Sequence, residues 1–186
     1  HAAGAAPKDD LLDMFMLVKD EDTGERMSDV QLRDEVVTML TAGHETTANA
    51  LSWTLLLLSR HPEVARRVHH ELDTVLAGQL PTGGDLHQLR YLDQVFSESM
   101  RLYPPVWAIA RAAKGEQTLH GYRIPDGGYA VMSPYVVHRH SAYWHNPEGF
   151  DPDRFSPEAV TARKERGVPR HAYLPFAAGP RKCIGD

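Results

Sequence analysis

The sequence predicts an α+β fold in which helices dominate. Apolar residues recur at helical spacing through much of the first hundred residues, and short segments bounded by Gly and Pro follow between residues 106 and 132. From residue 146 onward the chain is rich in proline and charge, which indicates an ordered but irregular loop that runs to the single cysteine. Helices therefore come first, small β-segments second and a loop last.

The first half of the chain carries the helix signals. Residues 8–19 form a short amphipathic candidate helix. Ser28 lies three residues before Gln31, an arrangement that predicts a capping box at the start of a long helix. The apolar stripe of this helix continues to Leu58 over about thirty residues, or roughly 45 Å. Pro62 is suited to open the next helix at its first position.

Gly and Pro divide the elements that follow. Gly78 and the cluster at residues 81–84 end the third helix, and a further helix over residues 86–102 ends before Pro104. The periodicity then shortens to that of strands. The strand candidates are residues 106–112, 118–119, 122–124 and 129–132.

Length and charge limit the class of protein. The chain has 186 residues, enough for one domain with a substantial core, and its net charge of −5 without a concentrated basic stripe argues against nucleic acid as the main partner. No apolar run reaches the roughly 18 residues that a membrane span needs. The first residues lack a starting Met and the pattern of a signal peptide, so we expect a piece of a longer protein and leave an upstream membrane anchor open.

The single cysteine lies in residues 176–185, Phe-Ala-Ala-Gly-Pro-Arg-Lys-Cys-Ile-Gly. One cysteine cannot form an internal disulfide, an iron–sulfur cluster or a cysteine-built zinc site, which leaves an inert thiol, a nucleophile or a single thiolate ligand. Gly179 lets backbone pass close to a bulky partner. Arg181 favours a thiolate and suits an anionic cofactor edge, so the surroundings of Cys183 favour the ligand.

The spacing Phe-x-x-Gly-x-Arg-x-Cys-x-Gly resembles the haem-binding signature of the cytochrome P-450 superfamily, the haem-thiolate monooxygenases. The resemblance implies that Cys183 is the thiolate ligand of haem b (iron protoporphyrin IX). It also implies that Phe176, Gly179 and Arg181 contact the cofactor from the same loop. A thiolate ligand favours cleavage of the O–O bond of dioxygen.

A second motif lies in the long helix, at residues 42–47. Gly43 in mid-helix costs about 1 kcal/mol relative to alanine, and Thr46 can bond back to the carbonyl of Ala42 and open the helix. From the residues alone, the favoured interpretation is a crossing of small residues with Glu45 in solvent. The superfamily has a similar (Ala/Gly)-Gly-x-(Asp/Glu)-Thr pattern. The similarity implies that Ala42 and Gly43 border the haem and that Glu45 and Thr46 deliver protons to dioxygen.

Two further motifs concern ion pairs. Glu98 and Arg101 are spaced i and i+3, and as an exposed pair they would contribute only about 0.3–0.5 kcal/mol, but their apolar setting predicts a buried helix end. Arg154, taken alone, reads as a loose surface arginine. The Glu-x-x-Arg helix and the later arginine resemble superfamily elements that tie the segment behind the cysteine to the core. Asp153 stands where relatives carry glutamate.

The fifth motif follows Pro105. Arg111 at a strand start is ordinary by itself. By the resemblance, Arg111 and Arg181 meet the haem propionates from two sides, which suits planar guanidinium groups. The resemblance also implies that four consecutive residues line the substrate side of the haem: Val106, Trp107, Ala108 and Ile109.

Histidines offer a competing reading, because the chain has eleven. His69–His70 and the group His138, His140 and His145 raise the possibility of zinc. The chain has no His-Glu-x-x-His motif, and its carboxylates are not spaced to complete a site. A zinc hydrolase is therefore the weaker alternative.

The five motifs together imply a haem-thiolate monooxygenase that activates dioxygen to hydroxylate or epoxidise a small apolar substrate. Residues 1–186 would be the C-terminal portion of a single cytochrome P-450 domain, without the N-terminal half and the helix after the cysteine loop. A ferredoxin or flavoprotein reductase would supply electrons, since no nucleotide-binding glycine fingerprint is present, and Arg181 and Lys182 are candidate docking points. The richness of the sequence in alanine and arginine favours a bacterial source and hence a cytoplasmic enzyme. The alternative is a non-catalytic truncated fragment that does not bind haem productively.

Overall fold

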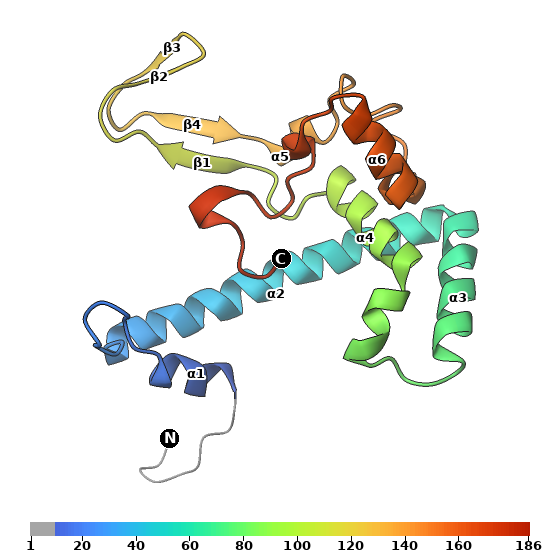
Figure 1. The fold of residues 1–186 in the computed structure, drawn as a ribbon, viewed down its shortest axis with the longest axis horizontal. Coiled ribbons are helices and arrows are strands. Elements are labelled where there is room, and N and C mark those ends of the chain that lie inside the picture. Colours follow the sequence, from blue (N-terminus) through green and yellow to red (C-terminus); the bar gives the residue numbers. More distant parts are fainter. Residues whose placement is uncertain (1–9) are drawn as a thin grey trace. The chain divides into compact units, whose positions relative to one another are not determined.

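The computed structural model describes residues 10–186 (Figure 1). The chain divides into two compact units, His1–Glu45 and Thr46–Asp186, and α2 contributes residues to both. The α-helices are α1 (Leu11–Leu17), α2 (Asp29–Arg60), α3 (Pro62–Leu76), α4 (Arg90–Leu102), α5 (Pro134–Val137) and α6 (Pro157–Glu165). The strands are β1 (Ile109–Ala112), β2 (Gln117–Leu119), β3 (Tyr122–Ile124) and β4 (Tyr129–Met132). Short 3₁₀ helices are η1 (Gly83–Gln88), η2 (Pro152–Phe155), η3 (Arg170–Ala172) and η4 (Gly179–Arg181).

The start of α2 follows the predicted capping box. The backbone N–H of Ser28 donates to Gln31 Oε1 at 2.9 Å, and the N–H of Gln31 donates to Ser28 Oγ at 3.3 Å. The helix then runs for 32 residues, as the long apolar stripe predicts. The helix expected over residues 8–19 is α1, capped by Asp10, and the beginning of that expected range lies outside the described residues.

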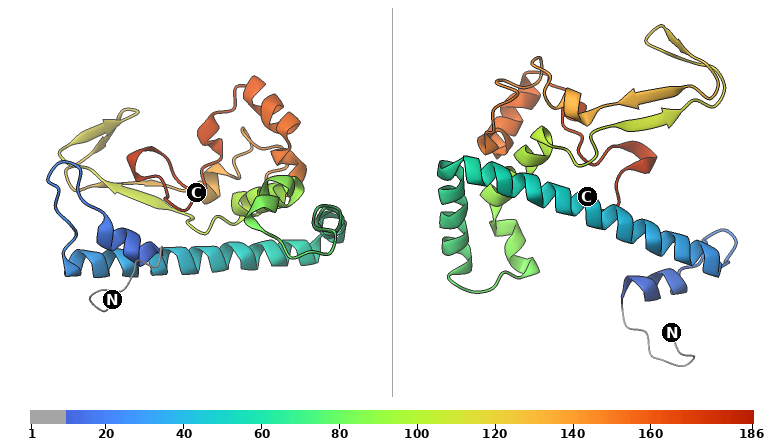
Figure 2. Two further views of the ribbon diagram at one scale, coloured as in Figure 1. Left: turned by 60° about the horizontal axis from the view of Figure 1, so that its bottom comes forward. Right: turned by 180° about the vertical axis from the view of Figure 1, so that it is seen from behind.

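The helices α3 and α4 form the apolar core of the larger unit. Val64 and Val68 of α3 pack with Tyr91 and Val95 of α4, and Figure 2 shows the two helices side by side. Pro62 opens α3 as predicted. The single helix predicted over residues 86–102 is wrong at its start, because η1 ends at Gln88 and a separate helix begins at Arg90.

A side chain from α3 explains where α4 begins. Glu71 accepts hydrogen bonds from the backbone N–H groups of Tyr91 and Leu92 at 2.7 and 2.9 Å. These donors have no partner within their own helix, so the carboxylate satisfies them and lies at the positive end of the helix dipole. The start of α4 is therefore fixed by a tertiary contact.

The strands form two antiparallel pairs, β1 with β4 and β2 with β3. Figure 1 shows the β2–β3 pair beyond the far end of the β1–β4 pair. The predicted strands at residues 118–119, 122–124 and 129–132 are confirmed. The strand predicted over residues 106–112 begins only at Ile109, where pairing with Met132 starts. The partner strand β4 ends at Met132 and Ser133 caps α5, so residues 106–108 have no continuation of β4 to pair with.

The segment after residue 146 contains more helix than the sequence predicts. In place of a wholly irregular loop, α6 occupies Pro157–Glu165, and Ser156 Oγ accepts from the N–H of Ala159 at 3.2 Å. Pro157 at the first helical position and Ser156 before it are start signals that were available in the sequence. The helix lacks an apolar stripe, so periodicity alone does not reveal it.

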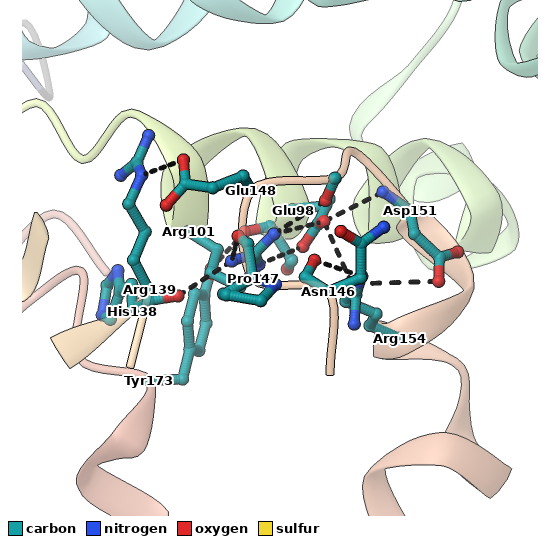
Figure 3. A network of polar contacts seen from close by, with 12 residues as sticks. Glu98, Arg101, His138, Arg139, Asn146, Pro147, Glu148, Asp151, Arg154 and Tyr173 are labelled. Carbon is teal, nitrogen blue, oxygen red and sulfur yellow. Dashed lines mark hydrogen bonds and ion pairs between the residues drawn. The ribbon is translucent and has the colours of Figure 1, made fainter. Parts of the chain in front are cut away.

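A buried network of charges lies between α4 and the segment before α6 (Figure 3). Glu98 and Arg101 are both 0% exposed, and Arg101 donates from Nε and Nη2 to the two carboxylate oxygens at 2.6 and 2.8 Å. Arg154 Nε lies 3.3 Å from Glu98 Oε1, and the N–H of Asp151 donates to the same oxygen at 2.9 Å. Burial raises the pKa of the Glu98 carboxyl, and the hydrogen bonds from Arg101 counter part of that rise.

The two arginines also hold the backbone of residues 138–149. Arg101 donates to the carbonyls of His138, Pro147 and Gly149 at 2.8, 2.6 and 3.0 Å. Arg154 donates to the carbonyls of two further residues, His145 and Asn146. The network therefore fixes the course of the chain that leads toward the cysteine loop.

Within the described residues, no helix combines the length and apolar character that crossing a bilayer requires.

Candidate active site

The larger unit contains a mainly apolar cavity of about 570 Å³, which is within the usual range for small-molecule sites. Its wall comes from α2, α4, the segment before β1, β1 itself and the cysteine loop. The lining residues are Thr46, Thr47, Ala50, Leu51, Phe96, Met100, Pro105, Val106, Ile109, Arg111, Pro175, Phe176, Ala177, Arg181, Cys183 and Gly185. Segments separated by more than a hundred residues in the sequence thus meet at one cavity.

Several residues singled out from the sequence lie on this wall. Thr46 comes from α2 and Arg111 from β1, whereas Phe176, Arg181 and Cys183 come from the C-terminal loop. Val106 and Ile109 also line the cavity. The cysteine, Thr46 and the two arginines therefore share the wall of one apolar cavity.

The assignment of residues 106–109 to the substrate side of the haem stays a prediction, and two of the four do not lie on this cavity wall. Trp107 and Ala108 are not on the cavity wall, and Trp107 is 67% exposed. The backbone carbonyl of Trp107 accepts a hydrogen bond from Ser133 Oγ at 2.8 Å.

Three residues assigned from the long-helix motif belong to the smaller unit. Ala42, Gly43 and Glu45 lie in α2 before Thr46, and a Cβ built on Gly43 meets no atom within 4 Å. The roles assigned to them by the resemblance stay predictions. Gly179 does not line the cavity, but it shapes the loop that does.

The cysteine loop is closed by its own backbone. The N–H of Cys183 donates to the carbonyl of Phe176 at 2.9 Å, and the N–H of Lys182 donates to the carbonyl of Gly179 at 3.0 Å. The N–H of Gly185 points to Cys183 Sγ at 3.4 Å, a donor that stabilises negative charge on sulfur. Gly179 has a φ of +81°, a conformation that favours glycine.

The same loop holds Ala177 at a φ of +60°, where a side chain costs about 1–2 kcal/mol. We expect Ala177→Gly to relieve this cost, whereas Ala178→Gly, at an ordinary extended φ of −154°, only adds flexibility to the unfolded chain. The free energy of unfolding should therefore be about 1 kcal/mol higher for Ala177→Gly than for Ala178→Gly. Urea denaturation of the two variants measures this difference, and equal values would show that Ala177 carries no strain.

Sequence reasoning missed the lining residues on α4 and part of α2. Phe96 and Met100 are four residues apart on α4, and Ala50 and Leu51 follow Thr46 along α2. Their helical spacing predicts a buried face, but the sequence does not show what that face borders. In the described residues, no three His, Cys, Asp or Glu side chains lie close enough together to hold a metal ion between them.

Sequence reasoning also missed His138, which it weighed only as a zinc ligand. The ring is 0% exposed, and its Nε2 accepts a hydrogen bond from the N–H of Leu174 at 2.8 Å. Burial lowers the pKa of His138 from 6.5 to about 4, with the nearby Arg101 and Arg139 charges acting in the same direction. The structure therefore keeps this imidazole neutral at neutral pH.

The lowered pKa makes a prediction for acid stability. Between pH 6.5 and about pH 4 the unfolded chain binds a proton on this ring that the folded chain does not bind, so acidification favours unfolding. We expect this ring to remove about 3 kcal/mol of the free energy of unfolding as the pH falls through that range. Urea denaturation at several pH values checks it with His138→Gln as the control, because that variant cannot titrate. Equal pH slopes for the two proteins would contradict the prediction.

The amino-acid sequence matches the cytochrome P450 family over residues 3–186. The chain belongs to the cytochrome P450 family. This confirms the family that the motifs indicate, and the mainly helical architecture with small sheets confirms the predicted fold class.

Known P450 proteins are similar over nearly the whole chain. Cyclooctatin synthase from Streptomyces melanosporofaciens is 42% identical over 185 residues, which cover 100% of this chain and 39% of that protein. Pentalenene oxygenase from Streptomyces avermitilis is 42% identical over 179 residues, covering 96% and 38%. The retinoic acid-bound cyanobacterial CYP120A1 has a TM-score of 0.88 at 32% identity and covers 97% of this chain and 41% of that one. The chain therefore spans about two-fifths of the length of these P450 relatives.

Membership of the P450 family implies a haem cofactor. The cavity fits such a group in its chemistry, since its apolar wall suits the macrocycle and its single thiol is a suitable iron ligand. Arg111 and Arg181 suit the two carboxylates of a haem. Within the described part of the chain, neither guanidinium forms an ion pair with a carboxylate, so both are available to an anionic ligand.

Proposed function

We propose that this chain is the haem-thiolate portion of a monooxygenase that inserts one oxygen atom of dioxygen into a small apolar substrate. The observation that carries the proposal is the single cavity onto which Thr46, Arg111, Arg181 and Cys183 converge. Relatives named as oxygenases or monooxygenases support the same reaction class. Because the chain spans about two-fifths of these relatives, the activity is proposed for the protein that contains it.

The cavity residues have distinct proposed tasks. Cys183 supplies the thiolate to haem b, and the N–H of Gly185 stabilises the charge on its sulfur. Arg111 and Arg181 hold the two propionates. Bound haem with a thiolate ligand supplies the oxygen-activating chemistry. Thr46 holds the hydroxyl that passes protons toward the oxygen site, with Glu45 as the acid behind it.

The substrate proposed is a mainly hydrocarbon molecule. Val106, Ile109, Leu51 and Phe96 give the cavity an apolar wall. Relatives are named for pentalenene and carotene, and one solved structure contains retinoic acid. These three compounds are unsaturated and mainly hydrocarbon, so hydroxylation or epoxidation of such a molecule is the reaction proposed here.

The electrons are proposed to come from a ferredoxin or a flavoprotein reductase. Lys182 and Arg181 are candidate cationic contacts for an acidic donor protein. Lys182 is more than half exposed and forms an ion pair with Asp186. An acidic electron-donor protein would therefore have to compete with Asp186 for contact with Lys182.

Labelled dioxygen tests the proposed reaction. The haem-loaded protein, a reductase system and an unsaturated hydrocarbon substrate should yield a product with one labelled oxygen atom, and the second labelled atom should appear in water. A product whose oxygen comes from water or from peroxide alone would contradict the monooxygenase assignment.

The hydroxyl of Thr46 gives a further prediction. We expect Thr46→Ala to retain haem while the product formed per dioxygen consumed falls by about tenfold, because positioned proton donors contribute at least that much. Thr47→Ala is the matched control, since Thr47 lines the same cavity and should change this ratio little. Oxygen-electrode and product measurements on both variants decide, and equal ratios would make Thr46 a packing residue.

A further inference from the structure

Two side-chain contacts hold the chain just before it enters the cavity wall. Tyr173 Oη donates to the backbone carbonyl of Ser97 on α4 at 3.0 Å. At the next residue, the N–H of Leu174 donates to Nε2 of His138 at 2.8 Å. Pro175 then begins the run of residues that line the cavity.

His138 is itself held firmly. Its carbonyl accepts from Arg101 Nη1 at 2.8 Å, and its ring lies against Tyr173 with a centroid distance of 5.2 Å. Figure 3 shows His138 and Tyr173 beside the Glu98–Arg101 network. The histidine therefore connects the buried ion-pair network to the segment that carries the cysteine.

The hydrogen bond defines the state of the ring. Because Nε2 accepts from Leu174, the neutral imidazole carries its proton on Nδ1, which has no partner among the described residues. A protonated ring would place a donor against the N–H of Leu174, and a buried carboxylate would add an unpaired charge. A neutral acceptor with the reach of Nε2 is what this position requires.

The contact is transmitted to the cysteine by a short path. Phe176 lies two residues after Leu174 and lines the cavity, and its carbonyl accepts from the N–H of Cys183 at 2.9 Å. A shift of Leu174 would move Phe176 and, with it, the backbone hydrogen bond that fixes Cys183.

We propose that His138 is a positioning residue that sets the place of the Cys183 loop on the cavity wall through its hydrogen bond to the N–H of Leu174. The inference rests on the proposed function, because it takes Cys183 as the haem ligand. His138 touches neither the cavity nor Cys183, so its effect is on ligation geometry and not on the reacting atoms.

The test compares variants that differ in the acceptor offered to Leu174. The readout is the ratio of non-thiolate to thiolate species in the ferrous carbon monoxide spectrum of the haem-loaded protein. We expect His138→Phe to raise this ratio about tenfold, since it leaves the partly buried Leu174 N–H without its acceptor. His138→Gln places an amide oxygen near the position of Nε2 and should return the ratio close to that of the native protein.

Two further variants separate positioning from general destabilisation. Val95→Ala weakens the core at a residue that is 0% exposed and not on the cavity wall, and should leave the ratio unchanged. His138→Asn keeps a polar side chain, but its amide oxygen falls short of Leu174, so it should behave like His138→Phe. If His138→Phe fails to fold, the spectral ratios of His138→Asn and His138→Gln provide the test of the positioning role.

A second readout does not depend on ligation. Hydrogen exchange of residues 173–183, measured by mass spectrometry on the same proteins, should quicken in His138→Asn and stay slow in His138→Gln. Equal spectra and equal exchange for Asn and Gln would overturn the positioning role while the proposed function stands. A native protein without the thiolate species would overturn both.

Discussion

Replacing Arg101 with leucine is expected to remove about 3–5 kcal/mol from the free energy of unfolding, because it leaves the carboxylate of Glu98 buried with its main partner gone. Both side chains are 0% exposed, and Arg101 also satisfies three backbone carbonyls between His138 and Gly149. A loss of this size is a large fraction of the free energy of unfolding of a typical domain, which is about 5–15 kcal/mol. Urea denaturation followed by circular dichroism measures this loss, and the denaturation midpoint of Arg101→Leu should be far below that of the native protein.

An exposed ion pair in the same unit provides the matched control. Arg123 pairs with Glu116, and their side chains are 74% and 53% exposed. Arg123→Leu should change the free energy of unfolding by no more than about 1 kcal/mol. If the two leucine variants lose the same stability, burial does not set the importance of the Glu98–Arg101 pair.

Replacing Cys183 with serine is expected to abolish thiolate ligation completely while the fold stays intact. The cysteine is exposed, and apart from the N–H of Gly185 its sulfur makes no hydrogen bond within the described residues. Serine is close in size, but its alcohol does not ionise near neutral pH to serve as the same soft ligand. Magnetic circular dichroism of the haem-loaded variant should lack the thiolate signature, and its denaturation midpoint should match that of the native protein.

Two outcomes would count against this account of Cys183. A thiolate signature that persists in Cys183→Ser would mean that no cysteine of this chain is the ligand, since Cys183 is the only one. A large loss of stability would instead give the thiol a structural role.

Sequence alone predicts those elements whose signals are local. The capping box at Ser28 and Gln31 marks the start of α2, and Pro62 marks the start of α3. The hairpin turn at His120 and Gly121 has φ values of +48° and +85°, and the flanking strands are found where the alternation predicts them.

The elements that sequence reasoning misplaced depend on contacts from elsewhere. Helix α4 begins at Arg90 because Glu71, about twenty residues earlier, accepts from its first N–H groups. Helix α6 has the start signals of Ser156 and Pro157 but no apolar stripe, so the pattern of apolar residues does not predict it. Local patterns do not show either the partner of a buried group or the place of a helix without a core-facing side.

The candidate site likewise combines features that local motifs predict with features that only the tertiary structure shows. The motif around Cys183 indicates the chemistry, and the resemblance brings Thr46, Arg111 and Arg181 into one hypothesis. Only the fold shows that these residues share a cavity and that Trp107 is exposed and not on its wall. His138 carries no motif of its own, because its importance arises from Leu174, 36 residues later.

The most direct test of the central claim, that Cys183 ligates haem in this cavity, is the ferrous carbon monoxide difference spectrum of the native protein loaded with haem. The account predicts the red-shifted Soret band of a thiolate-ligated haem, which disappears in Cys183→Ser. A haem that binds with only the band of a non-thiolate ligand, or the same band in both proteins, would contradict it.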